Sequence, residues 1–135
     1  MKSQLPKVVL DTNIFVAANF NPRSASAQIL RMASQRKIKI LWSESIRREL
    51  EIILNNIKAK TKIRRLISKI LVEQNKLVRL PKIKIITDDP EDNKFISCAL
   101  AGRADFIITN DDHLLKLKEF HNIRIVQPRE FLKQC

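Results

Sequence analysis

Short, almost entirely apolar runs alternate along this chain with longer stretches in which apolar residues recur every three or four positions. The short runs suit buried strands, whereas the longer stretches suit amphipathic helices. The runs expected to form strands are residues 8–10, 38–42, 106–108 and 123–126, together with one of 77–80 and 84–87, of which 84–87 is favoured. This alternation predicts one α/β domain over residues 1–135, with a three-layer α/β/α architecture around a mostly parallel five-stranded sheet.

The expected helices carry recognisable start and stop signals. Ser24 or Ser26 can cap the second helix and Ser43 the third, because a side-chain hydroxyl accepts a hydrogen bond from a free amide of the first turn. Asp89 can cap the helix that Pro90 would open, and Gly102 would end that helix. These signals place helices between the predicted strands.

Composition narrows the class of protein. With 135 residues, 44% of them hydrophobic, the chain is expected to bury a single core. No apolar run approaches the ~18 residues of a membrane span, and the first seven residues lack the apolar core of a signal peptide. Cys98 and Cys135 show no metal-ligand spacing, so we expect a reduced, cytoplasmic protein with no membrane partner. A single glycine excludes the Gly-rich loops that bind nucleotide phosphates.

Charge is distributed unevenly along the chain. Residues 1–82 contain 18 Lys and Arg against 5 Asp and Glu, whereas residues 83–135 contain 8 and 9. In the stretch 58–82, the residues Lys62, Arg65 and Lys69 form a stripe at helical spacing. This stripe is either an ordinary solvated helix face or a wall along which a nucleic-acid backbone lies. The net charge of +12 favours the second interpretation, with nucleic acid as the partner.

Four acidic residues stand out because three of them follow predicted strands and one lies beside a helical core seam: Asp11, Asp92, Asp111 and Glu49. Each has a simpler explanation, since the three aspartates can act at helix N-termini and Glu49 can form a salt bridge to a nearby arginine. The C-terminal ends of parallel strands meet at one edge of a sheet. We therefore expect the four carboxylates to converge.

If several carboxylates lie close together, the repulsion between their negative charges must be offset by a cation. Two negative charges ~5 Å apart repel each other by about 3 kcal/mol at an effective dielectric of ~20. Mg²⁺ and Mn²⁺ prefer carboxylate oxygen, whereas two histidines, His113 and His121, make a poor case for zinc. A Mg²⁺ or Mn²⁺ site beside a basic surface predicts phosphodiester hydrolysis.

The acids belong to an ordered set of motifs: Val8-Val9-Leu10-Asp11-Thr12-Asn13, residues 45–50 with Glu49, Asp89-Pro90-Glu91-Asp92-Asn93, and Ile108-Thr109-Asn110-Asp111 followed by Leu114-Leu115. This set extends over essentially the whole chain and resembles the PIN-domain ribonucleases. Its nearest likeness is to small prokaryotic PIN proteins described as toxins of toxin–antitoxin systems. In two places the resemblance is incomplete, because Asn110 stands where the family often has glycine and His113 where it often has a second aspartate.

The resemblance implies endonucleolytic cleavage of RNA that depends on a divalent metal ion. It also implies that the protein often forms homodimers and has an antitoxin partner. It assigns Asp11, Glu49, Asp92 and Asp111 as catalytic residues and metal ligands. It also implies supporting roles near the carboxylates for further residues: Asn13, Asn93, Asp89 and His113. The departure at His113 leaves the number of metal ions open between one and two.

Three alternatives remain at this stage. The chain can be an RNA-processing nuclease without a toxin role, or a basic RNA-binding module of the same fold that does not cleave RNA. A metal-dependent phosphatase or phosphoacceptor fold ranks last, because such proteins usually carry a second acid where this chain has Asn13.

Overall fold

The first strand, β1 (Lys7–Leu10), is apolar throughout because both of its faces are buried. Val8 and Leu10 pack into one hydrophobic cluster, and Val9 packs into a second cluster on the other side of the sheet. A strand buried on both faces has no position for a polar side chain until it ends. The computed structural model describes residues 4–83 and 93–134.

The sheet has five strands in the order β2-β1-β3-β5-β4. Its other members are β2 (Lys39–Leu41), β3 (Phe106–Ile108), β4 (Glu119–Phe120) and β5 (Ile123–Val126). β1 pairs in parallel with β2 and with β3, and β3 pairs in parallel with β5. β4 pairs antiparallel with β5. The predicted mostly parallel five-stranded sheet is confirmed.

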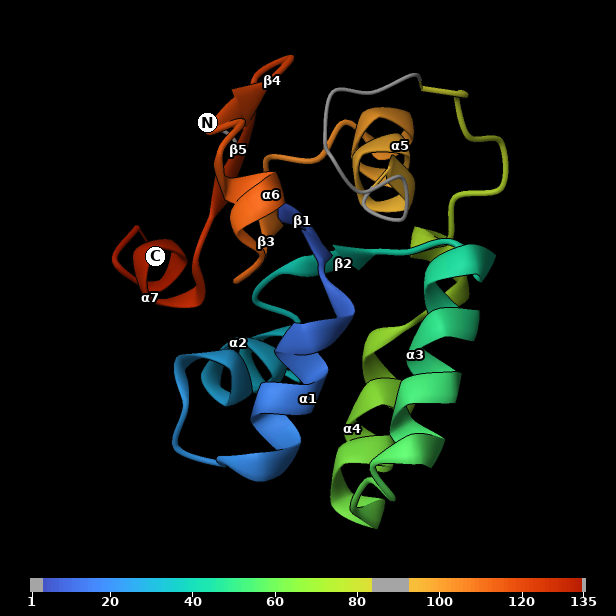
Figure 1. The fold of residues 1–135 in the computed structure, drawn as a ribbon, viewed down its shortest axis with the longest axis vertical. Helices are drawn as coiled ribbons and strands as arrows, with labels where there is room; N and C mark the ends of the chain where they lie inside the picture. The colour runs from blue at the N-terminus through green and yellow to red at the C-terminus, as the bar shows by residue number, and fades with distance from the viewer. Residues whose placement is uncertain (1–3, 84–92, 135) are drawn as a thin grey trace.

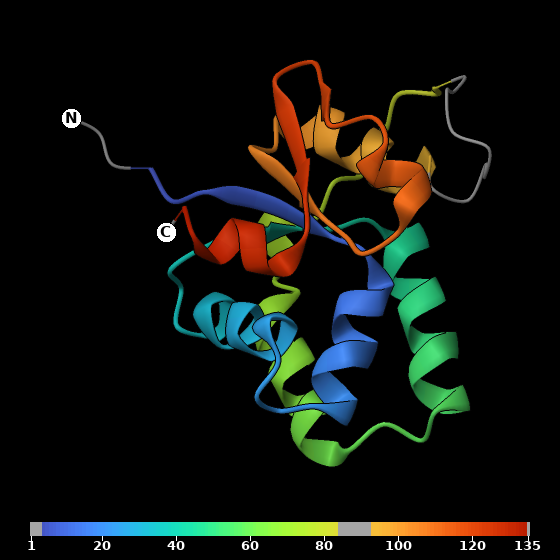
Figure 2. The same cartoon turned by 60° about the vertical axis from the view of Figure 1, so that its left-hand side comes forward.

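Helices cover both faces of this sheet (Figures 1 and 2). The cluster on one face draws on α1 (Thr12–Phe20), α2 (Ala25–Ser34), α3 (Glu44–Asn56), α4 (Thr61–Ile70) and α7 (Pro128–Leu132). The cluster on the other face draws mainly on α5 (Asn93–Gly102) and α6 (Asp112–Leu115). The arrangement is the predicted three-layer α/β/α architecture. Within the described ranges, every helix is too short or too polar to cross a lipid bilayer.

Two predicted helix caps are present. The Ser24 hydroxyl accepts a hydrogen bond from the Ala27 amide (3.1 Å), and the Ser43 hydroxyl accepts one from the Ile46 amide (3.4 Å). Ser26, the alternative to Ser24, lies buried inside α2. The choice between the two serines is therefore settled in favour of Ser24.

One strand of the sheet, β4, was not expected from the sequence. Residues 77–80 form no strand, and the favoured run 84–87 lies outside the described residues, as does the cap proposed at Asp89. The sheet instead includes β4, whose two residues are too few to give an alternating pattern in the sequence. β4 returns antiparallel because a tight turn joins it directly to β5.

A strap formed by residues 72–77, which includes the short 3₁₀ helix η1 (Glu73–Asn75), lies alongside the end of β2. The Trp42 indole N–H donates to the Val72 carbonyl (2.8 Å), and the Leu77 amide donates to the Trp42 carbonyl (2.8 Å). The Lys76 ammonium lies 5.3 Å from the centre of the Trp42 ring. The strap thus pairs with Trp42, the residue that follows β2, at the edge of the sheet.

Gly102 ends α5, as the sequence suggested, but its small size is what the fold uses. A Cβ atom at this position would lie 2.5 Å from Leu41 Cδ1 and 3.3 Å from Leu77 Cδ2. The residue that takes the left-handed conformation after the helix is Arg103, with φ of 53°. Gly102 therefore lets the end of α5 approach β2 closely.

Candidate active site

Two adjacent parallel strands deliver Asp11 and Asp111 to the same edge of the sheet. Leu10 of β1 is aligned with Ile108 of β3, and the Asp11 amide continues the ladder by donating to the Ile108 carbonyl (3.0 Å). Asp11 follows β1 directly, and Asp111 follows β3 after two residues. The predicted placement of these two acids beyond the carboxyl ends of neighbouring strands is observed.

Asp11 is only 4% exposed, so its carboxylate depends on protein donors. Thr109 Oγ1 donates to Asp11 Oδ2 (2.7 Å), and the Asn13 amide donates to Asp11 Oδ1 (3.2 Å). The second bond makes Asp11 the N-cap of α1. The capping explanation and the site explanation thus apply to the same residue.

Thr109 links the two aspartates through its hydroxyl group. Besides donating to Asp11, Thr109 Oγ1 accepts a hydrogen bond from the Asp111 amide (2.9 Å). The Asp111 carboxylate in turn accepts from the His113 amide (2.9 Å) and caps α6, with His113 Nδ1 3.8 Å from the same oxygen. One buried threonine therefore fixes the geometry of both acids.

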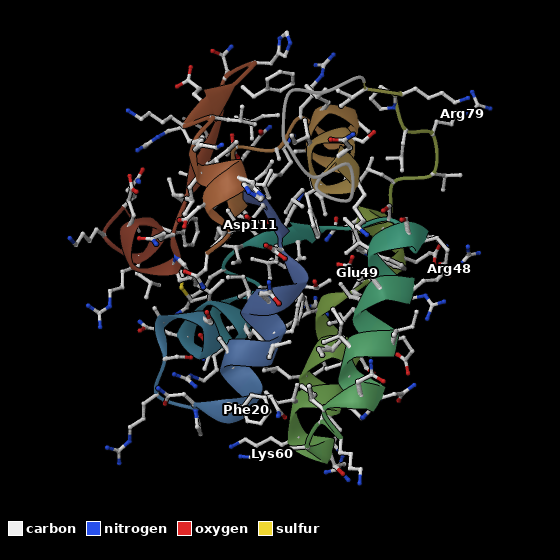
Figure 3. The ribbon with its side chains drawn as sticks, in the orientation of Figure 1. Phe20, Arg48, Glu49, Lys60, Arg79 and Asp111 are labelled. Atoms are coloured by element: carbon white, nitrogen blue, oxygen red, sulfur yellow. The ribbon has the colours of Figure 1, made fainter. Side chains whose placement is uncertain are left out.

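Glu49 reaches the same region from α3. Thr12 Oγ1 donates to Glu49 Oε1 (2.8 Å), and Lys94 Nζ of α5 lies 2.5 Å from Glu49 Oε2. Figure 3 shows Glu49 on the side of α3 that faces α1, whereas Arg48, 73% exposed, points away. The ion pair suggested by the sequence exists, but the expected arginine partner was wrong, since the partner is Lys94.

Electrostatics connect the three described acids. Burial raises the pKa of Asp11 above its ordinary value, and the negative charges of Asp111 and Glu49 act in the same direction. The hydrogen bonds from Thr109 and Asn13 oppose this rise in the pKa. Asp111 and Glu49 come from two other segments of the chain (Figure 3), and both carboxylates therefore lie close enough to Asp11 to affect it.

Other predicted site residues lie elsewhere or cannot be located. Asp92 and Asp89 fall outside the described residues. Asn13 contributes its backbone amide and has an exposed side chain, and His121 packs edge-on against the Phe120 ring.

The predicted basic stripe of Lys62, Arg65 and Lys69 lies on the exposed face of α4. Lys62 lines a cavity beside α1 and α2, and Lys69 lines a different one beside β2. The stripe therefore extends between two separate hollows of the surface.

The donor atoms gathered here are the kind that Mg²⁺ and Mn²⁺ prefer, namely carboxylate oxygens. At the start of α5, Asn93 Oδ1 is buried and finds no hydrogen-bond partner among the described residues, and an amide oxygen also suits these ions. Within residues 4–83 and 93–134, no three His, Cys, Asp or Glu side chains form a group that could hold a metal ion. The residue types fit a hard divalent ion.

Sequence reasoning overlooked three residues of this site. Thr12 and Thr109 carry no charge and stood out only as neighbours of Asp11 and Asp111. Lys94 offered a clearer signal, because a lysine in the first turn of a helix opposes the helix dipole and therefore invites the question of its partner.

Comparison with known proteins identifies the family. A family model described as the PIN domain matches residues 7–113. The chain belongs to the PIN domain family. PIN domains are generally nucleases, and they generally use divalent metal ions.

The chain is also similar to a protein from an archaeon and to a chain of a solved bacterial complex. An uncharacterized protein of Methanocaldococcus jannaschii is 30% identical over 149 aligned positions, which cover 95% of this chain and 90% of the relative. The crystal structure of VapBC2 from Rickettsia felis bound to a DNA fragment from their promoter contains a chain with a TM-score of 0.51 and 20% identity. The match covers 88% of this PIN domain and 96% of that chain. At this identity, the structural likeness concerns the fold.

Proposed function

We propose that this protein is a divalent-metal-dependent endoribonuclease and the toxin component of a toxin–antitoxin pair. The observation that carries the proposal is that Asp111 and Glu49 come from different segments and yet lie beside the buried Asp11 carboxylate, linked to it through Thr109 and Thr12. A chain gains nothing for its stability by collecting like charges around a buried aspartate, so the arrangement favours a role in binding a cation. Membership of a nuclease family supports the same conclusion.

Each described residue has a part in this proposal. Asp11 and Asp111 would hold the ion, together with Asp92 as the sequence suggests, and Thr109 keeps the first two in register. Thr12 fixes the rotamer of Glu49 at the border of the site. A bound Mg²⁺ or Mn²⁺ supplies an activated water molecule and offsets negative charge on the phosphodiester.

RNA is the proposed substrate because of the charge of the chain. The net charge is +12, and the stripe of Lys62, Arg65 and Lys69 provides exposed cations on α4. Such a surface gains affinity for phosphates by releasing counterions.

The toxin role and its antitoxin are inferred from the likeness to VapBC2. Beside α1, α2 and α4 lies a cavity of about 320 Å³ that combines apolar Ile63 and Leu66 with the cationic residues Arg31, Lys60 and Lys62. Figure 3 shows Lys60 near Phe20, whose side chain is 65% exposed at the end of α1. We propose that an acidic amphipathic segment of the antitoxin binds here. A homodimer and a cytoplasmic location belong to the same proposal.

Incubation of the purified protein with mixed RNAs and Mn²⁺ tests the nuclease activity. The wild type should cleave RNA internally, whereas Asp11→Asn and Glu49→Gln should lose at least ~100-fold in rate, on the scale at which such groups contribute. The matched control is Glu51→Gln, because Glu51 lies on α3 and pairs with Arg64 outside the site. Equal rates in all four proteins would refute the proposal.

Expression in a bacterial host tests the toxin role separately. Induction of the wild type should slow growth, and induction of Asp11→Asn at the same protein level should not. If the active enzyme cleaves RNA in vitro but leaves growth unaffected, the RNA-processing alternative is preferred.

A second candidate function is an RNA-binding module that does not cleave RNA. It is favoured by one observation, namely that Asp11, Glu49 and Asp111 each accept hydrogen bonds from the protein itself. In that case the protein would bind RNA without cleavage, and titration with Mn²⁺ would give no heat of binding.

A further inference from the structure

Lys94 is unusual for a residue in the first turn of α5. The amide end of a helix carries partial positive charge, so an ammonium group there is disfavoured. The Lys94 side chain is also only 14% exposed, which adds a desolvation cost. A lysine in such a place must be held by a strong anionic partner.

Among the described residues Glu49 is such a partner, and the contact uses one of its two oxygens. Lys94 Nζ lies 2.5 Å from Glu49 Oε2, and the other oxygen, Oε1, accepts from Thr12. Both carboxylate oxygens of Glu49 are therefore engaged by protein groups. By contrast, a divalent ion would have to displace the Lys94 ammonium to bind Oε2.

The formal charges support the same view. Asp11, Glu49 and Asp111 together carry three negative charges when ionised, and Lys94 supplies one positive charge among them. A second divalent ion would have to compete for Glu49 with the Lys94 ammonium, which belongs to the same chain and is always present next to it.

We propose that Lys94 takes the place of a second divalent ion next to Glu49, so that this nuclease binds one ion. Asp11 and Asp111 are the described carboxylates left for that ion, and Glu49 acts as a positioning residue held by Thr12 and Lys94. This inference rests on the proposed function, since it specifies the number of metal ions and the role of Glu49 within the same site.

A purely structural role for Lys94 makes a different prediction. If the ion pair only fastened α5 to α3, removing the lysine would lower stability but leave metal binding unchanged. The two roles are therefore separated by counting bound ions, independently of catalytic activity.

The experiment is titration of the metal-free protein with Mn²⁺ by isothermal calorimetry, on the wild type, Lys94→Met and Arg48→Met. Arg48→Met is the matched control because it removes one positive charge next to Glu49 in sequence from a side chain that points into solvent (Figure 3). The wild type and Arg48→Met should bind one ion. Lys94→Met should bind a second ion or bind Mn²⁺ at least tenfold more tightly.

Electron paramagnetic resonance gives a second readout on the same samples. The wild type should show the spectrum of an isolated Mn²⁺ ion, whereas Lys94→Met with two ions should show a coupled pair. Lys94→Arg keeps the charge and should bind one ion like the wild type. If Lys94→Met does not fold, Glu49→Gln replaces it, and this variant should retain one ion with less than a tenfold loss of affinity.

The outcomes distinguish this inference from the proposed function. Two ions in the wild type, or identical binding by the wild type and Lys94→Met, would overturn the role of Lys94 while leaving a metal-dependent nuclease intact. A loss of all Mn²⁺ binding in Glu49→Gln would do the same. No Mn²⁺ binding by any of the proteins would overturn the proposed function and this inference together.

Discussion

The carboxylate of Asp11 is buried at 4% exposure, yet it accepts hydrogen bonds from the Thr109 hydroxyl and the Asn13 amide. Burial raises its pKa, which means that the folded protein tolerates the negative charge poorly. The hydrogen bonds reduce this cost without removing it. The buried charge of Asp11 therefore lowers the stability of the protein, and the proposed metal site is what would use that charge.

The first prediction follows from this conflict. Asp11→Asn should raise the free energy of unfolding of the metal-free protein by about 1 kcal/mol, a few degrees in Tm, because asparagine can still cap α1 without burying a charge. Thermal unfolding in the presence of EDTA measures the change. A clear fall in Tm would mean that the carboxylate is chiefly a structural cap.

Thr109 supplies a contrasting prediction at the same contact. Thr109→Val keeps the shape of the side chain but removes the donor to Asp11 and the acceptor of the Asp111 amide. Leaving a buried carboxylate without this bond should cost about 1–3 kcal/mol. Chemical denaturation of Thr109→Val beside Asp11→Asn should therefore give shifts of opposite sign, and shifts of equal sign would contradict this account of the site.

At the scale of elements, the position of α5 depends on the close approach of Gly102 to β2. Gly102→Ala would bring a Cβ atom to 2.5 Å from Leu41 Cδ1, so Leu41 must move. We expect a loss of about 1–3 kcal/mol despite the better helix propensity of alanine. Denaturant unfolding checks this value, and the loss should shrink in a Leu41→Ala background, where the clash is absent. Full additivity of the two substitutions would argue against the contact.

The start of α3 is joined to the strap of residues 72–77 through Glu44. This carboxylate pairs with Arg47 on its own helix and with Lys76 of the strap (3.3 Å). Chiefly through the Arg47 hydrogen bond, its pKa is lowered from 4.5 to about 2. A lowered pKa in the folded state gives stability that is present above pH 4.5 and is lost as the pH falls through about 2.

Substitution of Glu44 by glutamine (Glu44→Gln) tests whether this carboxylate contributes to stability. At pH 6 the variant should melt slightly below the wild type, by an amount that high salt reduces because the group is solvated. The difference should disappear as the pH approaches 2. Thermal unfolding followed by circular dichroism across this range gives the test, with Glu51→Gln as the surface control. A difference that persists at pH 2 would point to another cause.

Sequence patterns predicted those elements whose causes are local. β1 was recognisable because burial of both faces demands an unbroken apolar run, and Ser24 and Ser43 were recognisable because capping acts within three residues. β4 was missed because two residues carry no periodicity. Gly102 was interpreted as a helix stop, since its contact with Leu41 depends on packing between distant segments.

The same distinction applies to the candidate site. Asp11 and Asp111 could be predicted because the ends of parallel strands meet at one edge, and Glu49 because its position conflicts with a core seam. The contact between Thr109 and Asp11, and the one between Lys94 and Glu49, join side chains from segments far apart in the chain. No spacing rule within a single sequence encodes such pairs.

At the scale of the whole molecule, the excess of positive charge lies in the first 82 residues. Replacing Lys62, Arg65 and Lys69 by glutamine should weaken RNA binding and reduce the slope of log Kd against log salt by about 2, if all three contact phosphates. Fluorescence anisotropy on a single-stranded RNA at several salt concentrations measures this slope. Replacing three other exposed cations, Arg103, Lys118 and Lys133, should change it less.

The strap beside β2 has a consequence for how this protein behaves when crowded. An open margin of a sheet offers unpaired amides and carbonyls onto which another chain can add. Here the margin next to β2 is occupied by the protein's own backbone at Trp42, and the opposite margin is the two-residue β4. Among the described residues, a chain that added to the sheet would therefore meet the strap at Trp42 on one side and a strand of only two residues on the other.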